Sequence, residues 1–421
     1  MKSWRSLDSH SPILGSVDVG TSKICTLIGQ KKGSAVEVLG VGLSSSRGIR
    51  RGKIIDINKA AGAIRESFSL ALEIARVVPD LVYAGIAGDG VSSLNLENEV
   101  FLNKGGREIS ARDVDKALEG SKAGVNLEGK RILHLLPQEY IVDDQTGIAD
   151  PAGMIGSRLR AKVHLITVDE NQFHNFSKSF QQAGLEVHRL VFQPLASAMA
   201  VLHPMEKEMG ITLVDIGGGT ADIAIFYGGS MRYSGVVPLG GESITSDLAV
   251  GLRTSRDEAE RIKLHHGCAF SRHIPEDEVI EAKDLGLSSL QTIKRKYACE
   301  IIEARVKELF LLIRRVIKSS GFYPFLRGGV VLTGGSALLE GIAELGSSIL
   351  ELPVRVGSPE SKDHVGMIQT VSHPMFSTAC GLLQFGLEEV TDRRARKSLV
   401  LDLENQRSKV IDWFKDFFML D

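Results

Sequence analysis

The chain has 421 residues, more than a single compact core usually holds, and its length predicts two or more domains. Lysine and arginine number 50 against 52 aspartates and glutamates, so the formal net charge is only −2, and aromatic residues make up 6%. A near-neutral chain with few aromatic residues does not favour binding to nucleic acid.

The four cysteines stand apart in the sequence, at Cys25, Cys268, Cys299 and Cys380. Without paired spacing they favour free thiols in a reducing compartment over disulfides or a zinc site. No apolar run is long enough to span a membrane, and the first residues lack the apolar core of a signal peptide. We therefore expect a soluble cytoplasmic protein, unless a segment at its edge holds it to a membrane.

The first element in chain order is a predicted hairpin over residues 16–29. An apolar strand ends in Asp18, a polar turn follows, and a second apolar strand begins at Ile24. The residues of the turn can present backbone N–H groups to an anion. The candidate binding residues here are Asp18, Gly20, Thr21, Ser22 and Lys23.

A helix over 56–76 and a buried strand over 81–87 follow, both predicted from their apolar periodicity. Residues 88–163 have a different texture and predict a small inserted α/β unit. In it we expect a helix from Ser110, with Asp113 at capping-box spacing, and two strands over 131–136 and 139–142. The alternative is a long surface loop, but loops of this length without structure are uncommon.

After the insertion we expect a strand over 163–168, a helix from Glu170 to Gly184 and a strand over 187–192. Residues 193–200 then read Gln-Pro-Leu-Ala-Ser-Ala-Met-Ala, which predicts a helix whose small side chains allow close packing. Gln193 stands at its first position.

Residues 213–226 repeat the layout of the first hairpin nearly 200 residues later, with three successive glycines in the turn. Two carboxylates beside a polyphosphate make sense mainly if a divalent cation lies between the negative groups. Two such hairpins indicate an internal duplication with a phosphate held between the halves, rather than two ordinary tight turns. The candidate binding residues of this copy are Asp215, Gly217, Gly218, Gly219, Thr220 and Asp222.

Beyond this hairpin, Gly240 and Gly241 open a helix whose N-terminal N–H groups could add to an anion site. A further helix over 256–265 carries Glu260 and Lys263 on one face. Residues 271–287 are acidic and are expected to be irregular, and we expect a long helix from about Leu290. It carries Arg305 and Glu308 on one turn, where the simplest interpretation is a surface ion pair.

A strand over 330–332 runs into a glycine turn that contains Gly334, Gly335 and Ser336, and a helix is expected over 337–345. A charge-rich tract over 392–406 then predicts a tether. Residues 409–421 predict a strongly amphipathic helix. Its apolar face consists of Val410, Trp413, Phe414, Phe417 and Phe418.

These motifs together resemble the actin, DnaK-chaperone and sugar-kinase superfamily, whose two phosphate loops have the form of the two hairpins. Residues 331–341 match the superfamily's adenosine loop. Within the superfamily the chain is most similar to the FtsA family of bacterial cell-division proteins, through residues 131–134 with 137–140, 161–167 and 266–269. The resemblance covers roughly residues 13–389 and returns in character at the C-terminus.

The resemblance implies an α/β, actin-like fold with a duplicated ribonuclease-H-like core in two lobes, a small inserted α/β subdomain and a C-terminal amphipathic helix. The resemblance also implies a division of the chain. The first core half covers 13–87, 164–203 and 357–390, and the second covers 204–255 and 321–356. An inserted subdomain over 88–163 and an outer subdomain over 256–320 are added to this core, and the ends of the chain are a flexible tail over 1–12, a charged linker over 391–407 and a membrane-targeting helix over 408–421.

The resemblance also implies roles for the candidate residues. The two hairpins and the turn over 334–336 would hold ATP, with Mg²⁺ bound by Asp18 and Asp215 through water, and Glu260 and Lys263 would lie at the ribose. Gln193 would orient an attacking water. Arg305 and Glu308 would meet the C-terminal tail of FtsZ.

The expected function is that of an ATP-binding protein with at most slow hydrolysis, which polymerises on the cytoplasmic face of the inner membrane and tethers FtsZ filaments at the division site. Its expected partners are FtsZ, further copies of itself, lipid and other division proteins. The alternatives are a sugar-kinase-type phosphotransferase, which would need a general-base carboxylate, and a pilus-assembly relative of FtsA, which is not expected to carry the aromatic tail.

Overall fold

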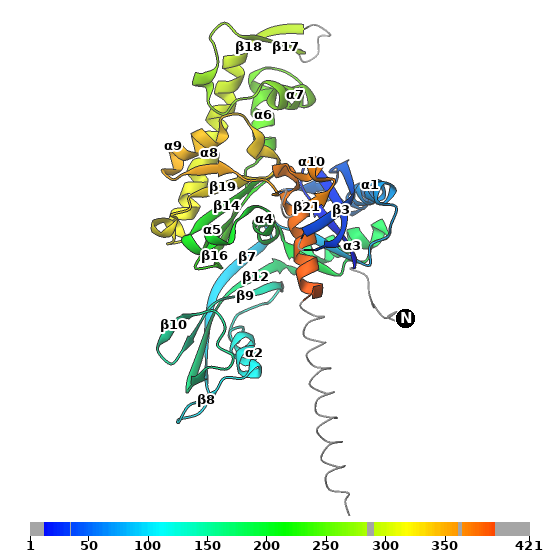
Figure 1. Ribbon diagram of the computed structural model, residues 1–421. Coiled ribbons are helices and arrows are strands. Elements are labelled where there is room, and N and C mark those ends of the chain that lie inside the picture. The colour runs from blue at the N-terminus through cyan, green and yellow to red at the C-terminus, as the bar shows by residue number, and fades with distance from the viewer. Residues whose placement is uncertain (1–11, 34, 284–289, 361–363, 392–421) are drawn as a thin grey trace, which may run out of the picture.

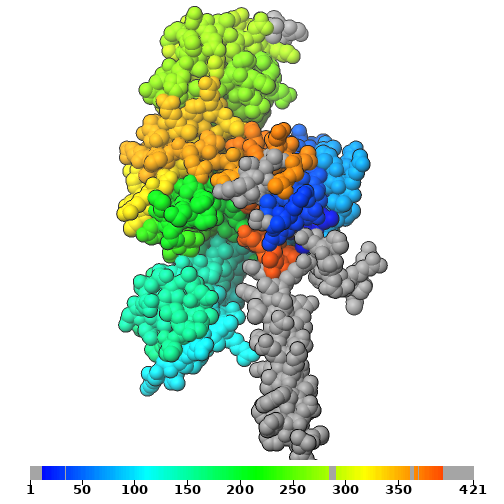
Figure 2. All heavy atoms as spheres, viewed as in Figure 1, coloured from blue at the N-terminus to red at the C-terminus, as the bar shows by residue number. Residues whose placement is uncertain are grey.

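The computed structural model describes residues 12–33, 35–283, 290–360 and 364–391. Two sheets form the centre of the molecule, an inserted unit projects from one side of it, and a group of helices rises from the other (Figure 1). In the space-filling view the insertion is a distinct mass that joins the body at one neck (Figure 2). Within the described residues no helix is both long and apolar enough to cross a membrane.

The first lobe contains a six-stranded sheet in which the hairpin β1–β2 is antiparallel and β6 runs parallel to β1. Asp56 caps the helix α1 (Ile57–Ala75) by accepting a hydrogen bond from the Lys59 amide at 3.0 Å. This helix and α3 (Glu170–Ala183) are the long helices of the lobe. The strands, in sheet order, are β13 (Arg189–Phe192), β6 (Leu81–Ile86), β1 (Ile13–Val19), β2 (Lys23–Lys32), β3 (Ala35–Ser45) and β21 (His364–Gly366).

The second lobe repeats this arrangement. Its hairpin β14–β15 is again antiparallel, a third antiparallel strand lies beside it, and β19 runs parallel to β14. The repeated strand order confirms the duplicated, two-lobed core. The strands, in sheet order, are β16 (Ser230–Val237), β15 (Ala221–Tyr227), β14 (Ile211–Ile216), β19 (Val330–Thr333) and β20 (Val354–Val356).

The insertion has its own four-stranded antiparallel sheet, covered by the helix α2 (Ala111–Gly120) and packed around its own apolar cluster. Asp113 accepts a hydrogen bond from the Ser110 amide at 2.9 Å, so the capping box is confirmed. The two strands expected over 131–136 and 139–142 are one strand, because its pairing only shifts register near Pro137. The strands, in sheet order, are β10 (Gln145–Ile148), β9 (Lys130–Val142), β12 (Arg158–Asp169) and β7 (Val91–Phe101).

The outer region consists of α6 (Gly241–Gly251), α7 (Arg256–His266), the hairpin β17 (Val279–Lys283) with β18 (Leu290–Lys294), and α8 (Arg295–Ser319). Two expectations were wrong here. The stretch expected to be irregular contains β17, and the long helix begins at Arg295 rather than near Leu290, because 290–294 pair as the second strand of that hairpin.

Two helices pass between the lobes. The first is α4 (Gln193–Val201), whose small residues Ala196, Ser197, Ala198 and Ala200 are buried. The second covers residues 377–391, so the body continues as helix to the last described residue. Gly381 belongs to it, and a Cβ there would lie 1.8 Å from the Ala196 carbonyl oxygen, so only glycine allows the two helices to pack this closely.

The helix expected over 337–345 was also wrong in its bounds. The chain forms a short 3₁₀ turn over Gly335–Leu338 and then α9 (Ile342–Leu350), because Gly341 has a positive φ that interrupts the helix. The remaining elements are α5 (Pro204–Met209), α10 (Ile368–Val371), β4 (Ile49–Arg50), β5 (Lys53–Ile54), β8 (Arg107–Glu108), β11 (Ile155–Gly156) and the 3₁₀ turns Ser271–His273, Tyr323–Phe325 and Pro374–Phe376.

Candidate functional site

The turns of the two repeated hairpins face each other across a cavity of about 270 Å³ between the lobes. A Cβ built on Gly218 would lie 1.9 Å from Ser22 Oγ, which shows how closely the two turns approach. Seventeen of the eighteen residues predicted to bind nucleotide line the cavity, and Gln193 lines it too. The eighteen are Asp18, Gly20, Thr21, Ser22, Lys23, Asp215, Gly217, Gly218, Gly219, Thr220, Asp222, Gly240, Gly241, Glu260, Lys263, Gly334, Gly335 and Ser336, of which only Gly240 does not line it.

The two turns close in the same way. The Gly20 amide donates to the Lys23 carbonyl at 3.0 Å, and the Gly217 amide donates to the Thr220 carbonyl at 2.9 Å. A Cβ on Gly240 would lie 2.6 Å from the carbonyl oxygens of both Gly217 and Gly218, so Gly240 supports the second turn from behind. The duplication therefore extends to the hydrogen bonding of the turns.

The start of α6 is less available than the sequence indicated. The amide of Gly241 donates to the Gly217 carbonyl at 3.0 Å, and that of Glu242 donates to the Gly218 carbonyl at 2.8 Å. These two N–H groups fix the glycine turn and are already occupied. The expectation that they are open to an anion is corrected: they hold the glycine turn in place.

Three buried carboxyl groups lie at this site. Burial raises the pKa of Asp18 to about 6, although Lys23, 3.8 Å away, opposes the shift, and burial raises the pKa of Asp222 to about 7. Burial likewise raises the pKa of Asp215, against hydrogen bonds from two hydroxyl groups. The negative charge of Asp215 further raises the pKa of Asp18 and the pKa of Asp222. Such a cluster favours the presence of a cation.

A metal ion is not held directly by a compact set of side chains. In the described part of the chain, no three or more His, Cys, Asp and Glu side chains come together as a possible metal site. The carboxylates instead face a cavity that has room for other ligands. This donor set fits a hard divalent cation that keeps most of its water and is shared with a phosphate.

Asp215 is held in place by two hydroxyl groups that the sequence analysis missed. Ser197 Oγ donates to Asp215 Oδ2 at 2.8 Å, and Thr378 Oγ1 lies 3.2 Å from the same oxygen. The two hydroxyl groups are also 2.9 Å apart. Ser197 comes from α4 and Thr378 from the helix over 377–391, so both helices between the lobes reach this carboxylate.

Gln193 lies next to the first carboxylate. Its Nε2 donates to Asp18 Oδ1 at 3.0 Å and to the Val19 carbonyl at 3.3 Å. A Cβ on Gly85 would lie 2.8 Å from Gln193 Cγ, so the glycine in β6 makes room for this side chain. The side-chain amide of Gln193 is thereby fixed at the wall of the cavity, and its nitrogen already donates hydrogen bonds within the protein.

Glu260 and Lys263 lie at the far end of the cavity and pair with each other at 2.7 Å. Lys263 Nζ also donates to Thr245 Oγ1 at 2.9 Å and to the Gly241 carbonyl at 3.2 Å. A side pocket of about 190 Å³ continues from here along Leu264 and Gly335. A polar end beside a narrow, partly apolar slot can hold a sugar with a flat ring attached.

Arg305 and Glu308 lie away from this cavity. They pair with each other on α8, and Arg305 also forms a double hydrogen bond with Asp247 on α6, with 2.9 Å between Nη2 and Oδ1. Arg305 therefore ties the two helices together. The residues predicted to contact a membrane, Val410, Trp413, Phe414, Phe417 and Phe418, lie outside the described residues.

Several lining residues carried no signal in the sequence, because they reach the cavity only through tertiary packing. Lys23 Nζ, for example, donates to the Met375 carbonyl at 2.7 Å, which joins the first turn to a segment 352 residues later. The lining residues that were missed are Val19, Gly52, Ala87, Leu264, Leu338, Pro374, Met375 and Thr378.

Comparison with known proteins was made by family models, by sequence and by structure. The family model "Cell division protein FtsA" matches residues 212–381, "SHS2 domain inserted in FTSA" matches 88–167, and "Hsp70 protein" matches 168–234. Among solved structures, the PilM-PilN type IV pilus biogenesis complex has a TM-score of 0.64 at 15% identity, covering 89% of this chain and 98% of that one. MreB5 of Spiroplasma citri bound to ADP has a TM-score of 0.54 at 14% identity, covering 92% of this chain and 98% of that one. These two likenesses concern the fold, which is confirmed as actin-like.

The relatives found by sequence have higher identity to this chain than these two structures. The cell division protein FtsA of Pseudomonas aeruginosa is 37% identical over 388 residues, which cover 92% of each chain. The cell division protein FtsA of Borreliella burgdorferi is 35% identical over 415 residues, which cover 97% of this chain and all of the relative. With the repeated hairpins, the inserted unit and these matches along nearly its whole length, the chain belongs to the FtsA family of cell-division proteins.

Proposed function

We propose that this chain is an ATP-binding, actin-like division protein that polymerises on the cytoplasmic face of the bacterial inner membrane and tethers FtsZ filaments there. The observation that carries the proposal is the cavity between the two glycine turns, with its buried carboxylates. FtsA-family membership favours this role over the sugar-kinase and pilus-assembly alternatives.

The nucleotide is assigned from the chemistry of the cavity walls. The turns over 20–23 and 217–220 can take the phosphates, because glycine lets backbone N–H groups approach an anion and Lys23 adds a positive charge. Glu260 and Lys263 can take the ribose. The glycine turn over 334–336 can take the base, since a Cβ on Gly335 would meet no atom within 4 Å. MreB5 of Spiroplasma citri, which has a similar fold, was solved with ADP bound, and this is consistent with a nucleotide here.

Magnesium is assigned to Asp18 and Asp215, which would hold it through bound water. A divalent cation would lower the free energy of the ionised forms of these buried carboxylates and bridge them to phosphate. In this arrangement Ser197 and Thr378 orient Asp215. Asp222, held by Thr220 at 2.9 Å, completes the polar wall.

Gln193 is proposed to orient water for slow hydrolysis. Because its nitrogen is bonded to Asp18 and Val19, its carbonyl oxygen is the atom that can accept a hydrogen bond from a water. With no carboxylate assigned as a strong general base, hydrolysis would be slow. ATP would then serve mainly to set the conformation of the lobes.

The FtsZ tail is proposed to bind the outer region. Arg305 and Glu308 lie on α8, and a groove of about 550 Å³ lies at the start of the same helix, between α6 and β18. The groove is lined by Lys294 and by the half-exposed ring of Tyr297, which suit a short peptide with acidic and apolar side chains. A tail that binds Arg305 must do so while the Arg305 guanidinium is also hydrogen-bonded to Asp247.

Membrane attachment is assigned to residues 408–421, from their sequence alone. Their aromatic face suits the bilayer interface, and one short helix binds it only marginally. A filament would present many such helices at once and gain affinity by avidity, which gives polymerisation a purpose.

The proposal is tested by liposome co-sedimentation of the full chain with FtsZ in the presence of ATP and Mg²⁺. We expect FtsZ to sediment with the lipid only when the chain is present. Trp413→Glu should leave both proteins in the supernatant. Arg305→Glu combined with Glu308→Lys should still sediment but no longer carry FtsZ, whereas Arg315→Glu, an exposed control on α8, should behave like the parent. FtsZ that sediments equally with the double variant would remove Arg305 and Glu308 from the interface.

A further inference from the structure

A second and larger cavity, of about 930 Å³, shares no lining residue with the first. The two helices that pass between the lobes reach both cavities. Gln193 at the start of α4 lines the first cavity and Met199 near its end lines the second, while Thr378 and Leu387 do the same on the helix over 377–391. None of the functions proposed above uses this second cavity.

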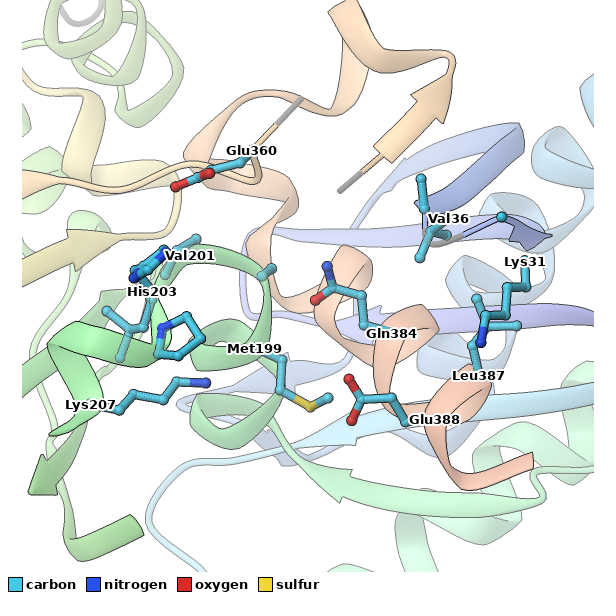
Figure 3. Close-up of a pocket in the computed structure, with 15 residues that line it drawn as sticks. Lys31, Val36, Met199, Val201, His203, Lys207, Glu360, Gln384, Leu387 and Glu388 are labelled. Atoms are coloured by element: carbon cyan, nitrogen blue, oxygen red, sulfur yellow. The ribbon is translucent and has the colours of Figure 1, made fainter. Parts of the chain in front are cut away.

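The cavity is lined by apolar side chains together with a few charged ones. Val36, Val201 and Leu387 give it a buried apolar floor. Figure 3 shows Lys207 and Glu388 approaching from opposite walls with Met199 between them. A mixed surface of this kind suits an amphipathic peptide better than a small, uniformly charged ligand.

Gln384, a residue of the cavity wall, contains a buried polar atom that has no partner among the described residues. The side-chain oxygen Oε1 of Gln384 is buried and has no hydrogen-bond partner in the described part of the chain. Gln384 lies on the helix over 377–391 and lines the cavity (Figure 3). Because an unsatisfied buried acceptor is costly, an occupant that brings a donor would stabilise the Gln384 amide once this oxygen turns toward the cavity. Burial also lowers the pKa of Lys207, although Glu388 opposes the shift, so a further negative group nearby would stabilise its charge.

We propose that this cavity is the docking site of the chain's own C-terminal segment, residues 408–421, which it shelters while the protein is away from a membrane. The inference rests on the proposed function in one respect, namely that this segment is the membrane-binding element. In this inference the cavity competes with the bilayer for the same aromatic face.

The position of the chain end supports this occupant. The described chain ends at residue 391, about one helical turn beyond Glu388, which is itself in the wall. The residues from 392 to 407 can span on the order of 50 Å when extended, so the segment beyond them can easily fold back. Such a tether also gives a local concentration in the millimolar range.

The chemistry of the segment matches the walls. Trp413 is the only residue of its apolar face with a side-chain donor, and its indole N–H can donate to Gln384 Oε1 once that amide turns toward the cavity. The segment carries Asp412, Asp416 and Lys415, whose mixed charges suit Lys31, Lys207 and Glu388 at the rim. The same mixture gives little attraction to anionic lipid. When the protein is in aqueous solution, the aromatic face must be shielded from solvent, and this cavity can shield it.

The test uses the full chain with Trp4→Phe, so that Trp413 is the only tryptophan. Without lipid, its emission should be blue-shifted and protected from acrylamide, independently of protein concentration. Gln384→Leu and Lys31→Glu should each raise the quenching constant at least twofold and lower the lipid concentration for half-maximal liposome binding severalfold. Lys178→Glu, the same charge change at an exposed site outside the cavity, should alter neither value.

Two results would overturn the inference. The first is a Trp413 already fully accessible to acrylamide in the lipid-free parent. The second is a protected Trp413 whose quenching neither cavity variant changes, or whose protection is lost on dilution, because the segment would then pack elsewhere or on another copy. The fluorescence needs no membrane. A protected Trp413 in a chain that never binds liposomes would reject the proposed membrane role and leave the docking site standing.

Discussion

Thr378 and Asp215 are 163 residues apart in the sequence, yet Thr378 Oγ1 lies 3.2 Å from Asp215 Oδ2. Ser197 donates to the same oxygen from a different helix. The two hydroxyl groups stabilise the ionised form of a carboxylate whose pKa burial raises. The Asp215 side of the candidate magnesium site is thus assembled from the second hairpin and from both helices that pass between the lobes.

We predict that Thr378→Val weakens binding of ATP with Mg²⁺ about tenfold, because a hydrogen bond to a charged group is worth roughly 1.5 to 3 kcal/mol. Asp215→Asn should have a larger effect in the same direction and should chiefly weaken the dependence on magnesium. Magnesium titrations of ATP binding by calorimetry measure both. Thr378→Ser keeps the hydroxyl group and should behave like the parent. Identical titrations for Asp215→Asn and the parent would count against a role for Asp215 at the metal.

The nucleotide-free chain should lose stability as the pH rises. The pKa values of Asp18 and Asp222 rise on folding from an ordinary value of 3.8 to about 6 and about 7. The folded state therefore retains protons that the unfolded state has released, and this contribution, fully present below about pH 4, is lost as the pH rises through about 7. Asp222→Asn should raise the free energy of unfolding at pH 8 by on the order of 2 to 4 kcal/mol.

Urea unfolding at pH 5 and pH 8 measures this dependence. Asp144→Asn, whose side chain is 97% exposed, is the control and should change neither value. Equal effects of Asp222→Asn at the two pH values would show that burial does not perturb this carboxyl group in the folded chain.

Gln193→Ala should slow ATP hydrolysis by tenfold or more while changing ATP affinity less than threefold. A group that positions water acts on the transition state, whereas binding rests on the two turns and the cation. Single-turnover hydrolysis and equilibrium binding, measured on the same preparation, separate the two effects. Unchanged hydrolysis would return Gln193 to a purely structural role beside Asp18.

Membrane binding should depend on aromatic insertion more than on charge. Burying a large apolar side chain is worth roughly 1.5 to 3 kcal/mol, whereas a lysine near an anionic surface gives about 1 kcal/mol, and the aspartates of the segment offset Lys409 and Lys415. Trp413→Glu should therefore release the chain from liposomes, while higher salt should change binding little. If salt alone strips the parent chain from liposomes, the aromatic-insertion account is wrong.

The sequence was most informative where one short stretch determines its own structure. The two hairpins could be found because each combines apolar strands, an aspartate and glycines in adjacent positions, and their repetition indicated the duplicated core. Ser197, Thr378 and Met375 could not be found, because nothing local marks them and only the packing of distant helices brings them to the cavity. Residues 290–294 join a strand because they pair with 279–283, and this tertiary contact overrides the helix that follows them.

The central claim is that ATP binds between the two glycine turns, and calorimetric titration with ATP in the presence of Mg²⁺ tests it most directly. Gly335→Val adds methyl groups where nothing lies within 4 Å, and Gly218→Val forces its side chain against Ser22 of the opposing turn. Both should remain folded by circular dichroism, and Gly62→Ala, on the open face of α1, is the control. We expect one ATP per chain for the parent and the control and no detectable binding for the two valine variants. Parental affinity in both valine variants would contradict the assignment of this cavity to ATP.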